Sequence, residues 1–548
     1  MTTPGADLRP DGAATIPAVL RSTADRHGAI EAIADDGGTR LDYARLLVEV
    51  EQVAAALLAR GLRPGDVVAV WAPNSARWAV AALGCLHVGI TLVPVNTRYR
   101  GEEAHHVLAR SRAVGLFVEH GFLGQDHLGM LRGAGPLPGL RTVVTLGEPR
   151  PEGPVPEGAV GWAELPWEEF LAGADSCPHG AVAAARDAVT PDTRMQVMFT
   201  SGTTGRPKGV PHTHGQVVRL YTTYTGNLGL RAGDRYLLVN PFFHSFGLLA
   251  GLLSCLVRGA TALPVRRLDP RSVLELIERE RVTGIPGPPT LYATLMNDPT
   301  RLQRDLSSLR LAVTGAAVIP SELIRRMRSD LGFRDILTAY GLTEITGVAT
   351  MCRLGDPDDL VESTSGRAVD DVEVAIDPVG GDGSGEILVR GYNVMSGYLG
   401  DPEAATAAAL DADGWLHTGD IGHLDEGGNL HITGRLGDMF IVGGFNVSPA
   451  EVEQLLCRHP AVSEAAVVGV PDERLGEVGR AFVVLRHGAA PSTEEELLAW
   501  CRERLANFKV PRSVVVLPEL PRAATGKVAK AALREPALNK NARPSATR

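Results

Sequence analysis

The sequence lacks paired cysteines and long apolar runs, and each absence excludes a class of protein. Six cysteines are spread over 548 residues with no C-x-x-C pair. This argues against a disulfide framework or a zinc site and favours the reduced thiols of a cytosolic protein. The longest apolar run, residues 246–257, is well short of the roughly 20 residues that a membrane-spanning helix needs. The first residues show no basic segment followed by an apolar stretch, so we expect no secretory signal and a cytoplasmic location.

An excess of basic residues is also absent. The chain has 54 Lys and Arg against 64 Asp and Glu, a net charge of −10, whereas a broad nucleic-acid-binding surface needs clustered cations. We therefore expect no nucleic-acid partner. A length of 548 residues exceeds what one hydrophobic core normally serves, so two or more domains are expected.

Helix-like and strand-like segments alternate along most of the chain. Asp42 can cap a helix that stops at Gly61, and a second helix is predicted from Ser75 to Val88. Apolar runs typical of buried strands occupy residues 67–74, 90–96, 234–243 and 309–317. This alternation predicts a layered α/β architecture in which ligands gather at strand ends. Residues 134–163 are rich in proline and glycine and are predicted to form a surface loop.

The chain beyond about residue 437 is predicted to form a separate, smaller unit. Residues 448–451 make a capping box with Pro449 at the first helical position. A second helix opens near Ser492, and apolar runs follow the pattern of strands at residues 464–470, 480–485 and 513–517. We therefore predict a large N-terminal α/β domain, residues 1–436, and a small C-terminal α+β domain, residues 437–548.

Residues 199–209 read "FTSGTTGRPKG" and crowd hydroxyls, glycines and one lysine together. Glycines let backbone N–H groups approach an oxyanion, hydroxyls add donors, and Lys208 supplies a mobile charge for a phosphate. The stretch is not a Walker A motif, because Lys208 is followed by Gly209 rather than Ser or Thr. Taken alone, it fits a flexible turn as well as a phosphate site.

Further motifs follow this stretch in a fixed order. They are "NPFFHSFG" (240–247), "TGAA" (314–317), "YGLTE" (340–344), "GWLHTGD" (414–420), "GRLGDMFIVGGFNVSPAEVE" (434–453) and "PRAATGKVAK" (521–530). The series resembles the adenylate-forming superfamily of acyl-CoA synthetases, peptide-synthetase adenylation domains and luciferases. Through "NPFFHSFG", "PGPPT", "TMCR" and "RLGEVGRAFVV" it is most similar to actinobacterial acyl-CoA ligases for polycyclic carboxylates, including steroid-ring propionates. The resemblance implies the adenylate-forming fold with a mobile C-terminal lid.

The resemblance also implies a reaction in two steps. A carboxylate attacks the α-phosphate of ATP to give an acyl-adenylate and pyrophosphate, and the thiol of coenzyme A then displaces AMP. The implied holders of the β- and γ-phosphates are Thr200, Ser201, Gly202, Thr203, Thr204, Gly205 and Lys208. Such transfers depend mostly on positioning and charge neutralisation, so donors and cations should converge there.

The "YGLTE" motif carries the next set of implied roles. Tyr340 would stack on adenine, Thr343 would bond the α-phosphate, and Glu344 would ligate Mg²⁺, a cation that accepts one or two carboxylates beside phosphates. Small residues beside the adenine plane would be Gly315, Ala316, Ala317 and Gly341. Without the resemblance, Glu344 fits a helix-terminal charge equally well, and the small residues fit a packing contact.

Later motifs would complete the site. By resemblance, Asp420 accepts hydrogen bonds from the ribose hydroxyls with help from Arg435, and Lys527 lies between the carboxylate and the α-phosphate during adenylation. The pantetheine tunnel of the second step would be lined by Gly443, Gly444 and Phe445. By themselves, Asp420 fits a turn and Lys527 a solvated loop.

His244 occupies the pocket position that separates subfamilies in this superfamily. Amino-acid-activating domains carry an aspartate about here to pair with the substrate ammonium, and a histidine beside phenylalanines offers no such anion. The resemblance therefore implies a bulky apolar, polycyclic acid as substrate. A histidine satisfied within the core is the competing interpretation, and His212 and His214 are expected to cap or pack.

The two steps require the small domain to rotate about a hinge, and the chain departs from its family there. The hinge position is usually Asp or Lys, and here it is Gly437. Glycine permits rotation but holds neither end state. This raises the hypothesis that only thioesterification of a supplied adenylate is efficient, because adenylation needs Lys527 docked. A harmless variation is the alternative.

Three other functions share parts of this pattern. An amino-acid adenylation enzyme would need a carrier domain, and "GADSC" at 173–177 lies far upstream of where one belongs. A luciferase-like oxidase shares the motifs, and a catalytically dead nucleotide-binding protein would have lost some of Lys208, Glu344, Asp420, Arg435 and Lys527. Release of AMP that depends on both an acid and coenzyme A separates these functions from an acid–CoA ligase.

Overall fold

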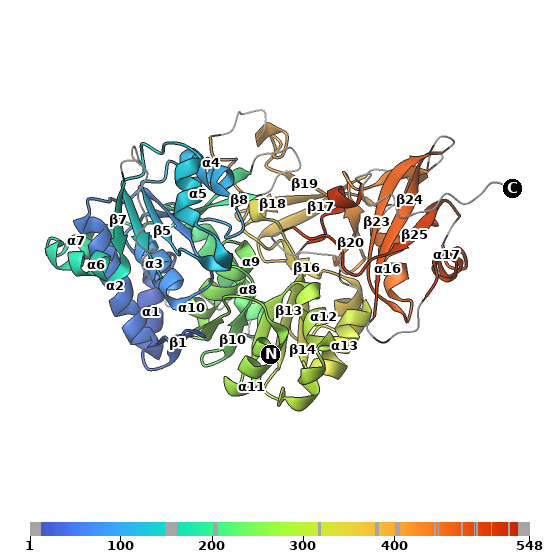
Figure 1. The fold of residues 1–548 in the computed structure, drawn as a ribbon, viewed down its shortest axis with the longest axis horizontal. Helices are drawn as coiled ribbons and strands as arrows, with labels where there is room; N and C mark the ends of the chain where they lie inside the picture. The colour runs from blue at the N-terminus through green and yellow to red at the C-terminus, as the bar shows by residue number, and fades with distance from the viewer. Residues whose placement is uncertain are drawn as a thin grey trace.

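A computed structural model gives the arrangement of the chain (Figure 1). It describes residues 13–534 except 148–161, 201–206, 316–318, 320, 379–382, 401–405, 443–444, 448, 473–474, 487, 489–491, 506 and 524–526. Within the described residues, the strands form four sheets.

Two large sheets of mostly parallel strands build the N-terminal part. One has the order β16-β15-β14-β13-β12-β10-β11-β1-β2 and the other the order β7-β6-β5-β3-β4-β8-β9. Strands of the first are β1 (Glu31–Ala34), β2 (Arg40–Asp42), β10 (Arg235–Leu238), β11 (Thr261–Pro264), β12 (Gly284–Gly287), β13 (Leu311–Gly315), β14 (Asp335–Tyr340), β15 (Thr350–Met351) and β16 (Arg367–Ala368). Strands of the second are β3 (Val67–Trp71), β4 (Thr91–Pro94), β5 (Gly115–Val118), β6 (Thr142–Thr145), β7 (Ala163–Pro166), β8 (Arg194–Thr200) and β9 (Lys208–Thr213).

One hydrophobic core joins these two sheets through helices that pack between them. The helices are α1 (Ile16–His27), α2 (Tyr43–Ala59), α3 (Ala76–His87), α8 (His214–Leu228) and α10 (Ser254–Arg258). Almost every residue of α3 is buried, which suits a helix enclosed on all sides. Asp42 caps α2 and Ser75 caps α3, as the sequence predicts. A second core lies under α4 (Gly101–Ser111) and α5 (His127–Gly133), on the other face of the β3-containing sheet.

The four apolar runs predicted as strands are β3, β4, β10 and β13, so the layered α/β prediction is confirmed. The prediction of a surface loop over residues 134–163 is wrong in part. Strand β6 lies inside that range and pairs in parallel with β5 and β7. Its sequence, "TVVT", is β-branched throughout, and pairing on both sides outweighs the glycines and prolines that flank it.

A smaller antiparallel sheet leads from the large domain toward the C-terminal unit (Figure 1). Its strands are β17 (Val372–Pro378), β18 (Gly385–Gly391), β19 (Leu416–Leu424) and β20 (Leu430–Arg435). In register, Asp420 of β19 faces Arg435 of β20. The last residue of β20 therefore stands two positions before Gly437.

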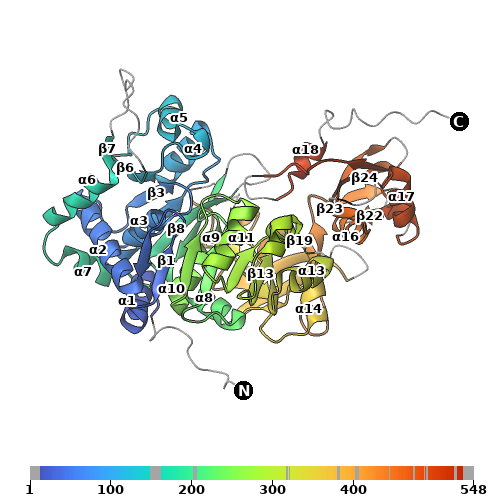
Figure 2. The same cartoon turned by 60° about the horizontal axis from the view of Figure 1, so that its bottom comes forward.

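The C-terminal unit has cores of its own. Strands β21 (Phe440–Val442), β22 (Phe445–Val447), β23 (Val462–Asp472), β24 (Gly476–Leu485) and β25 (Ser513–Val516) form its sheet, with α16 (Pro449–Cys457), α17 (Glu494–Arg502) and α18 (Lys530–Arg534) beside it. Figure 2 shows this unit projecting from the large domain. The predicted α+β unit is confirmed, and its buried clusters, which begin at Phe440, contain no residue of the N-terminal cores.

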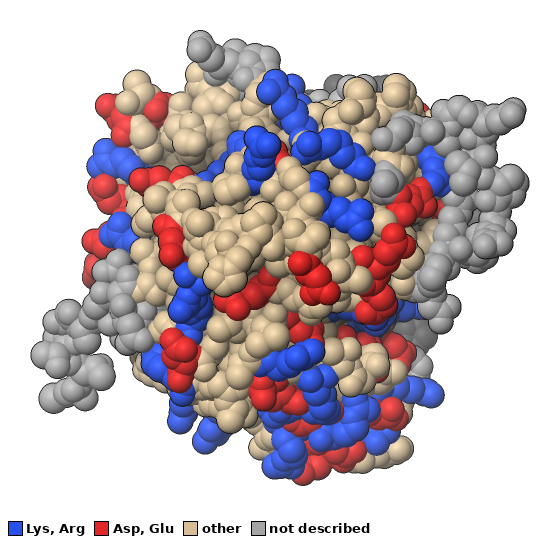
Figure 3. Space-filling view, turned by 90° about the vertical axis from the view of Figure 1, so that its left-hand side faces the viewer, with Lys and Arg blue, Asp and Glu red and all other residues tan. Residues whose placement is uncertain are grey.

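The surface and the cysteines fit the composition. On the face of the large domain drawn in Figure 3, positive and negative side chains are interspersed. All six cysteines are free thiols. Among the described helices, none is both long and apolar enough to cross a membrane.

Candidate active site

The phosphate-loop sequence lies at the tip of a β-hairpin. Strands β8 and β9 pair in antiparallel fashion, and Thr200 and Lys208 are direct partners at the open end. Ser201, Gly202, Thr203, Thr204 and Gly205 lie outside the described residues. The hairpin register thus fixes the positions of both loop ends. Thr200 places a hydroxyl at one end, and Lys208 places an ammonium at the other.

The "YGLTE" motif follows strand β14 in a short 3-10 turn, Thr343–Ile345. His212 supports this turn through a hydrogen bond to its backbone. Its buried ring places Nε2 2.8 Å from the Thr343 carbonyl oxygen and Nδ1 3.0 Å from Nε2 of Gln196. Nε2 must donate to the carbonyl, so the ring is neutral with its proton on Nε2. Burial lowers the pKa of His212 to about 4, which keeps this arrangement at neutral pH.

Tyr398 links the phosphate hairpin to the 3-10 turn. Its hydroxyl donates to Oε1 of Glu344 at 3.1 Å, and the ammonium of Lys208 lies 4.7 Å from the centre of its ring. Among the described residues, this is the one hydrogen bond given for the Glu344 carboxylate. Lys208 and Glu344 thus both contact one aromatic side chain, Lys208 at the ring face and Glu344 at the hydroxyl.

Asp420 is the centre of a polar cluster where β19 and β20 pair. It is 7% exposed, accepts a 2.8 Å bond from the Tyr340 hydroxyl and accepts a 2.6 Å bond from Nε of Arg435. Burial raises the pKa of Tyr340 well above its usual value, and the Asp420 charge acts in the same direction. Burial acts to lower the pKa of Arg435, but Asp420, with Tyr340 and Asp438 acting in the same direction, leaves that pKa raised. The cluster holds a fixed carboxylate beside a fixed cation.

Lys527 of the C-terminal unit reaches this cluster. A short hairpin presents it, with Ala523 N–H donating to the Lys527 carbonyl and Arg522 bridged to Val528. Enclosure by protein lowers the pKa of Lys527; Arg435 acts in the same direction, and Asp420 and Glu344 oppose it. The residue as a whole keeps exposed surface. Lys527 therefore lies within electrostatic reach of Arg435, Asp420 and Glu344 of the large domain.

His244 of the large domain also lies within electrostatic reach of Lys527. Its Nδ1 accepts the Phe246 N–H at 3.2 Å, which places the proton of the neutral ring on Nε2. Burial lowers the pKa of His244 to about 4, and the charge of Lys527 contributes. The ring is therefore a neutral donor at physiological pH. This agrees with a pocket position that carries no anion.

Two glycines of the predicted adenine strip are required for close backbone packing. A Cβ on Gly341 would lie 2.1 Å from the Gly347 carbonyl oxygen, and one on Gly315 would lie 2.5 Å from the Ala339 carbonyl oxygen. Any side chain at either position would displace a neighbouring backbone segment. Ala316 and Ala317 lie outside the described residues, as do Gly443 and Gly444, and the Phe445 side chain is not described.

Gly437 has no such requirement. Among the described residues, its two chain neighbours aside, no atom lies within 4 Å of the position that a Cβ would take there, and its φ is outside the left-handed region. The Arg435 carbonyl accepts the N–H groups of Asp438 and Met439, which folds residues 435–439 into a turn. The fold therefore tolerates a side chain at 437, and glycine is not needed to reach this arrangement of the two domains.

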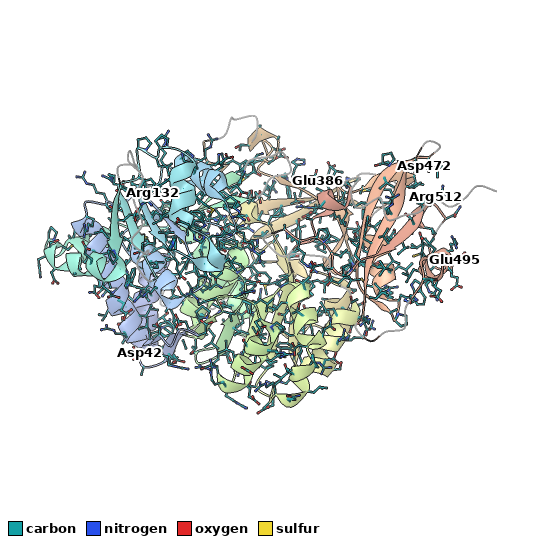
Figure 4. All side chains as sticks on the ribbon, viewed as in Figure 1. Asp42, Arg132, Glu386, Asp472, Glu495 and Arg512 are labelled. Carbon is teal, nitrogen blue, oxygen red and sulfur yellow. The ribbon has the colours of Figure 1, made fainter. Side chains whose placement is uncertain are left out.

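Three positioning residues have no recognisable local motif. Tyr398 and His212 support the turn after β14, and Glu386 of β18 accepts the Gly419 N–H at 2.8 Å and pairs with Nδ1 of His417 at 2.9 Å. Figure 4 labels Glu386 at the junction between the large domain and the C-terminal unit. Leu436 N–H in turn donates to the Gly419 carbonyl. Glu386 thus fixes the strand segment that carries Asp420.

The buried histidines of strand β9 and helix α8 predict an acid-sensitive fold. Burial lowers the pKa of His212 to about 4 and of His214 to about 3, against 6.5 as the ordinary value. Between pH 6.5 and the lowered pKa of each histidine, the unfolded chain binds more protons than the folded chain. The free energy of unfolding is therefore greatest above pH 6.5 and decreases, as the pH is lowered, by about 1.4 kcal/mol per pH unit for each histidine. We expect the melting temperature to drop between about pH 6.5 and 5. A His214→Gln variant should show a shallower drop, and an unchanged slope would contradict this assignment.

Comparisons with known proteins agree with this geometry. A family model described as AMP-binding enzyme matches residues 20–399, and one described as AMP-binding enzyme C-terminal domain matches residues 451–527. The chain belongs to the AMP-binding enzyme family. The predicted membership of the adenylate-forming superfamily is confirmed.

Relatives of this AMP-binding enzyme include two actinobacterial proteins with one name, "3-[(3aS,4S,7aS)-7a-methyl-1,5-dioxo-octahydro-1H-inden-4-yl]propanoyl:CoA ligase". The protein from Rhodococcus jostii is 49% identical over 525 residues, covering 95% of this chain and 98% of the relative. The protein from Mycobacterium tuberculosis is 50% identical over 526 residues, with the same coverage. The predicted similarity to actinobacterial ligases for polycyclic propanoates is confirmed.

A solved structure shares the fold over nearly its whole length. The crystal structure of the anthranilate CoA ligase AuaEII in complex with anthranoyl-AMP has a TM-score of 0.83 and 28% identity, and the match covers 97% of this chain and 98% of that one. The predicted fold class, a large α/β domain followed by a small α+β domain, is therefore confirmed.

Proposed function

We propose that this AMP-binding enzyme is an acid–CoA ligase that activates a bulky, polycyclic carboxylic acid through an acyl-adenylate. The observation that carries the proposal is convergence. Lys208, Glu344, Asp420 with Arg435, and Lys527 come from distant parts of the chain and are linked to one another by side-chain contacts and electrostatic interactions. Cations, a metal-binding carboxylate and a ribose-binding carboxylate are the set that nucleotidyl transfer from ATP requires.

In the first step, a carboxylate oxygen of the acid forms a bond to the α-phosphorus as the bond to the pyrophosphate oxygen breaks. Lys208 and the hydroxyls of residues 200–204 would hold the leaving phosphates. The hydroxyl of Thr343 would donate to the α-phosphate, and Lys527 would neutralise charge between that phosphate and the acid. Asp420, with Arg435 beside it, would accept the ribose hydroxyls. Tyr340 would lie along the base while its hydroxyl stays on Asp420.

Mg²⁺ fits the donor set of this site. Glu344 offers a hard carboxylate oxygen, Oε2, beside the Oε1 that accepts the Tyr398 hydroxyl. When bound, the ion would neutralise charge on the phosphates. Glu344 would be its protein ligand, the role that the "YGLTE" motif implies.

In the second step, the thiolate sulfur of coenzyme A attacks the acyl carbonyl carbon, and AMP leaves. We propose that residues 437–548 rotate about Gly437 between the steps, bringing Gly443, Gly444 and Phe445 to the tunnel in place of Lys527. The turn at 435–439 and the separation of the hydrophobic cores support a boundary at 436/437.

The acid is proposed from the named relatives and from His244. Both actinobacterial relatives carry the name of a ligase for a fused-ring propanoate. A neutral His244 with a proton on Nε2 would donate to a carboxylate oxygen, whereas an ammonium group would find no anion at this position. The amino-acid-activating alternative is therefore not favoured, nor is the luciferase-like one.

The experiment that tests the proposal is a panel of acids run twice. Each acid is supplied once as the free acid with ATP and once as its preformed adenylate, both with coenzyme A. We expect a fused-ring propanoate to give AMP and a CoA thioester in both arms, ahead of straight-chain acids and amino acids. Product from the preformed adenylates alone would support the hypothesis that only thioesterification is efficient because of Gly437. The position of Lys527 near the other site residues and the ligase relatives do not favour that hypothesis. No product in either arm would contradict the proposal.

A further inference from the structure

We propose that Tyr398 is a positioning residue that sets the metal-binding carboxylate and the phosphate-binding lysine in one geometry. This inference rests on the proposed function, because it concerns how that same site receives ATP with its magnesium ion. Tyr398 is the one side chain, among the described contacts, that touches both Glu344 and Lys208.

The backbone on both sides of Tyr398 is tied to the same two elements. Leu399 N–H donates to the Gly209 carbonyl at 2.8 Å, next to Lys208, and Met395 N–H donates to the Glu344 carbonyl at 2.8 Å. Asn393, which is buried, donates to the carbonyls of Ile345 at 3.3 Å and Val348 at 2.9 Å. The segment 393–399 therefore fastens the strand after the phosphate loop to the turn that carries Glu344.

The two contacts of the Tyr398 side chain act on different partners. The hydroxyl donates to Oε1 of Glu344, which fixes the carboxylate rotamer and leaves Oε2 for a cation. The ring face lies 4.7 Å from the Lys208 ammonium and attracts it through its quadrupole. The hydroxyl contact should therefore govern the magnesium-dependent part of ATP binding, and the ring should govern the part that persists without the metal.

The test is calorimetric titration of the full-length protein with ATP, once with Mg²⁺ and once with EDTA. Tyr398→Phe should shrink the ratio of the two dissociation constants by about threefold to tenfold, which is part of the contribution of one hydrogen bond to a charged group, because the bond orients the carboxylate and does not itself hold the metal. The dissociation constant in EDTA should stay the same. Tyr398→Leu should also weaken binding in EDTA, by about twofold to fivefold, because Lys208 loses its ring contact.

Tyr392→Phe is the matched control. The Tyr392 hydroxyl is buried and without a hydrogen-bond partner among the described residues, and Tyr392 directly precedes the segment 393–399. It should titrate like the wild type. In a Glu344→Gln background, Tyr398→Phe should have no further effect on the ratio of the ATP dissociation constants measured with EDTA and with Mg²⁺.

An unchanged magnesium ratio in Tyr398→Phe, with normal binding by the wild type, would overturn this inference and leave the proposed function standing. An additive effect in the Glu344→Gln background would also overturn it, because Tyr398 would then act elsewhere. Failure of the wild type to bind ATP at all would overturn the proposed function and this inference together.

Discussion

Replacing Lys527 by Ala should abolish most of the adenylation step and spare the thioesterification step. Lys527 lies within electrostatic reach of Arg435, Asp420, Glu344 and His244, and in the proposed reaction it supplies the charge that the C-terminal unit contributes. Loss of one preorganised donor to a developing charge costs about 10²–10³-fold in rate. We expect acid-dependent pyrophosphate exchange to fall by that factor.

The same variant supplied with a preformed acyl-adenylate and coenzyme A should work at close to the wild-type rate, because the proposed rotation removes Lys527 from the site before the second step. Arg512→Ala is a suitable control. Arg512 is an exposed cation of the C-terminal unit, labelled far from Glu386 in Figure 4. Equal losses in both half-reactions of Lys527→Ala would show that the lysine serves the fold or the nucleotide site rather than adenylation.

Replacing Asp420 by Asn should weaken both half-reactions through nucleotide binding. The Asp420 carboxylate is buried, and each oxygen is already directed by a donor, Tyr340 on one side and Arg435 on the other. An amide would turn one of its two ends into a donor and leave Arg435 without its counter-charge. Hydrogen bonds to charged groups contribute about 1.5–3 kcal/mol each. We therefore expect AMP affinity to fall by about 10- to 100-fold.

Measurement of AMP binding by calorimetry checks this, with pyrophosphate exchange and thioesterification assayed in parallel. Glu373→Gln, an exposed carboxylate on edge strand β17 of the same sheet, is the control and should change neither quantity. Unaltered AMP affinity in Asp420→Asn would place the ribose elsewhere. A loss confined to adenylation would mean that Asp420 acts with Lys527 rather than on the nucleotide.

The elements of this fold that were predictable are those with a local signal. The caps at Asp42 and Ser75 and the apolar runs that became β3, β4, β10 and β13 depend on residues within one helix or one strand. Strand β6 was not predictable, because its pairing with β5 and β7 comes from residues distant in sequence. Its four β-branched or apolar residues were too few to outweigh the composition around them.

The residues of the candidate site also differ in whether a local sequence signal marks them. Motif residues such as Lys208, Glu344 and Asp420 could be assigned by resemblance, because their neighbours in sequence mark them. Tyr398, His212 and Glu386 act on those residues from other strands and loops, and their roles follow only from the contacts they make. Gly437 shows the opposite case: its departure from the family suggested a functional change, but the space around it imposes no need for glycine.

The chemistry at the centre of this account can be tested with an acid labelled with ¹⁸O in its carboxylate. If a carboxylate oxygen attacks the α-phosphorus and the thiol later displaces AMP, one labelled oxygen must leave with AMP. Mass spectrometry of the products of a fused-ring propanoate, ATP and coenzyme A should find that single label in AMP and none in pyrophosphate. Unlabelled AMP, or label in a phosphate or pyrophosphate product, would contradict an acyl-adenylate route.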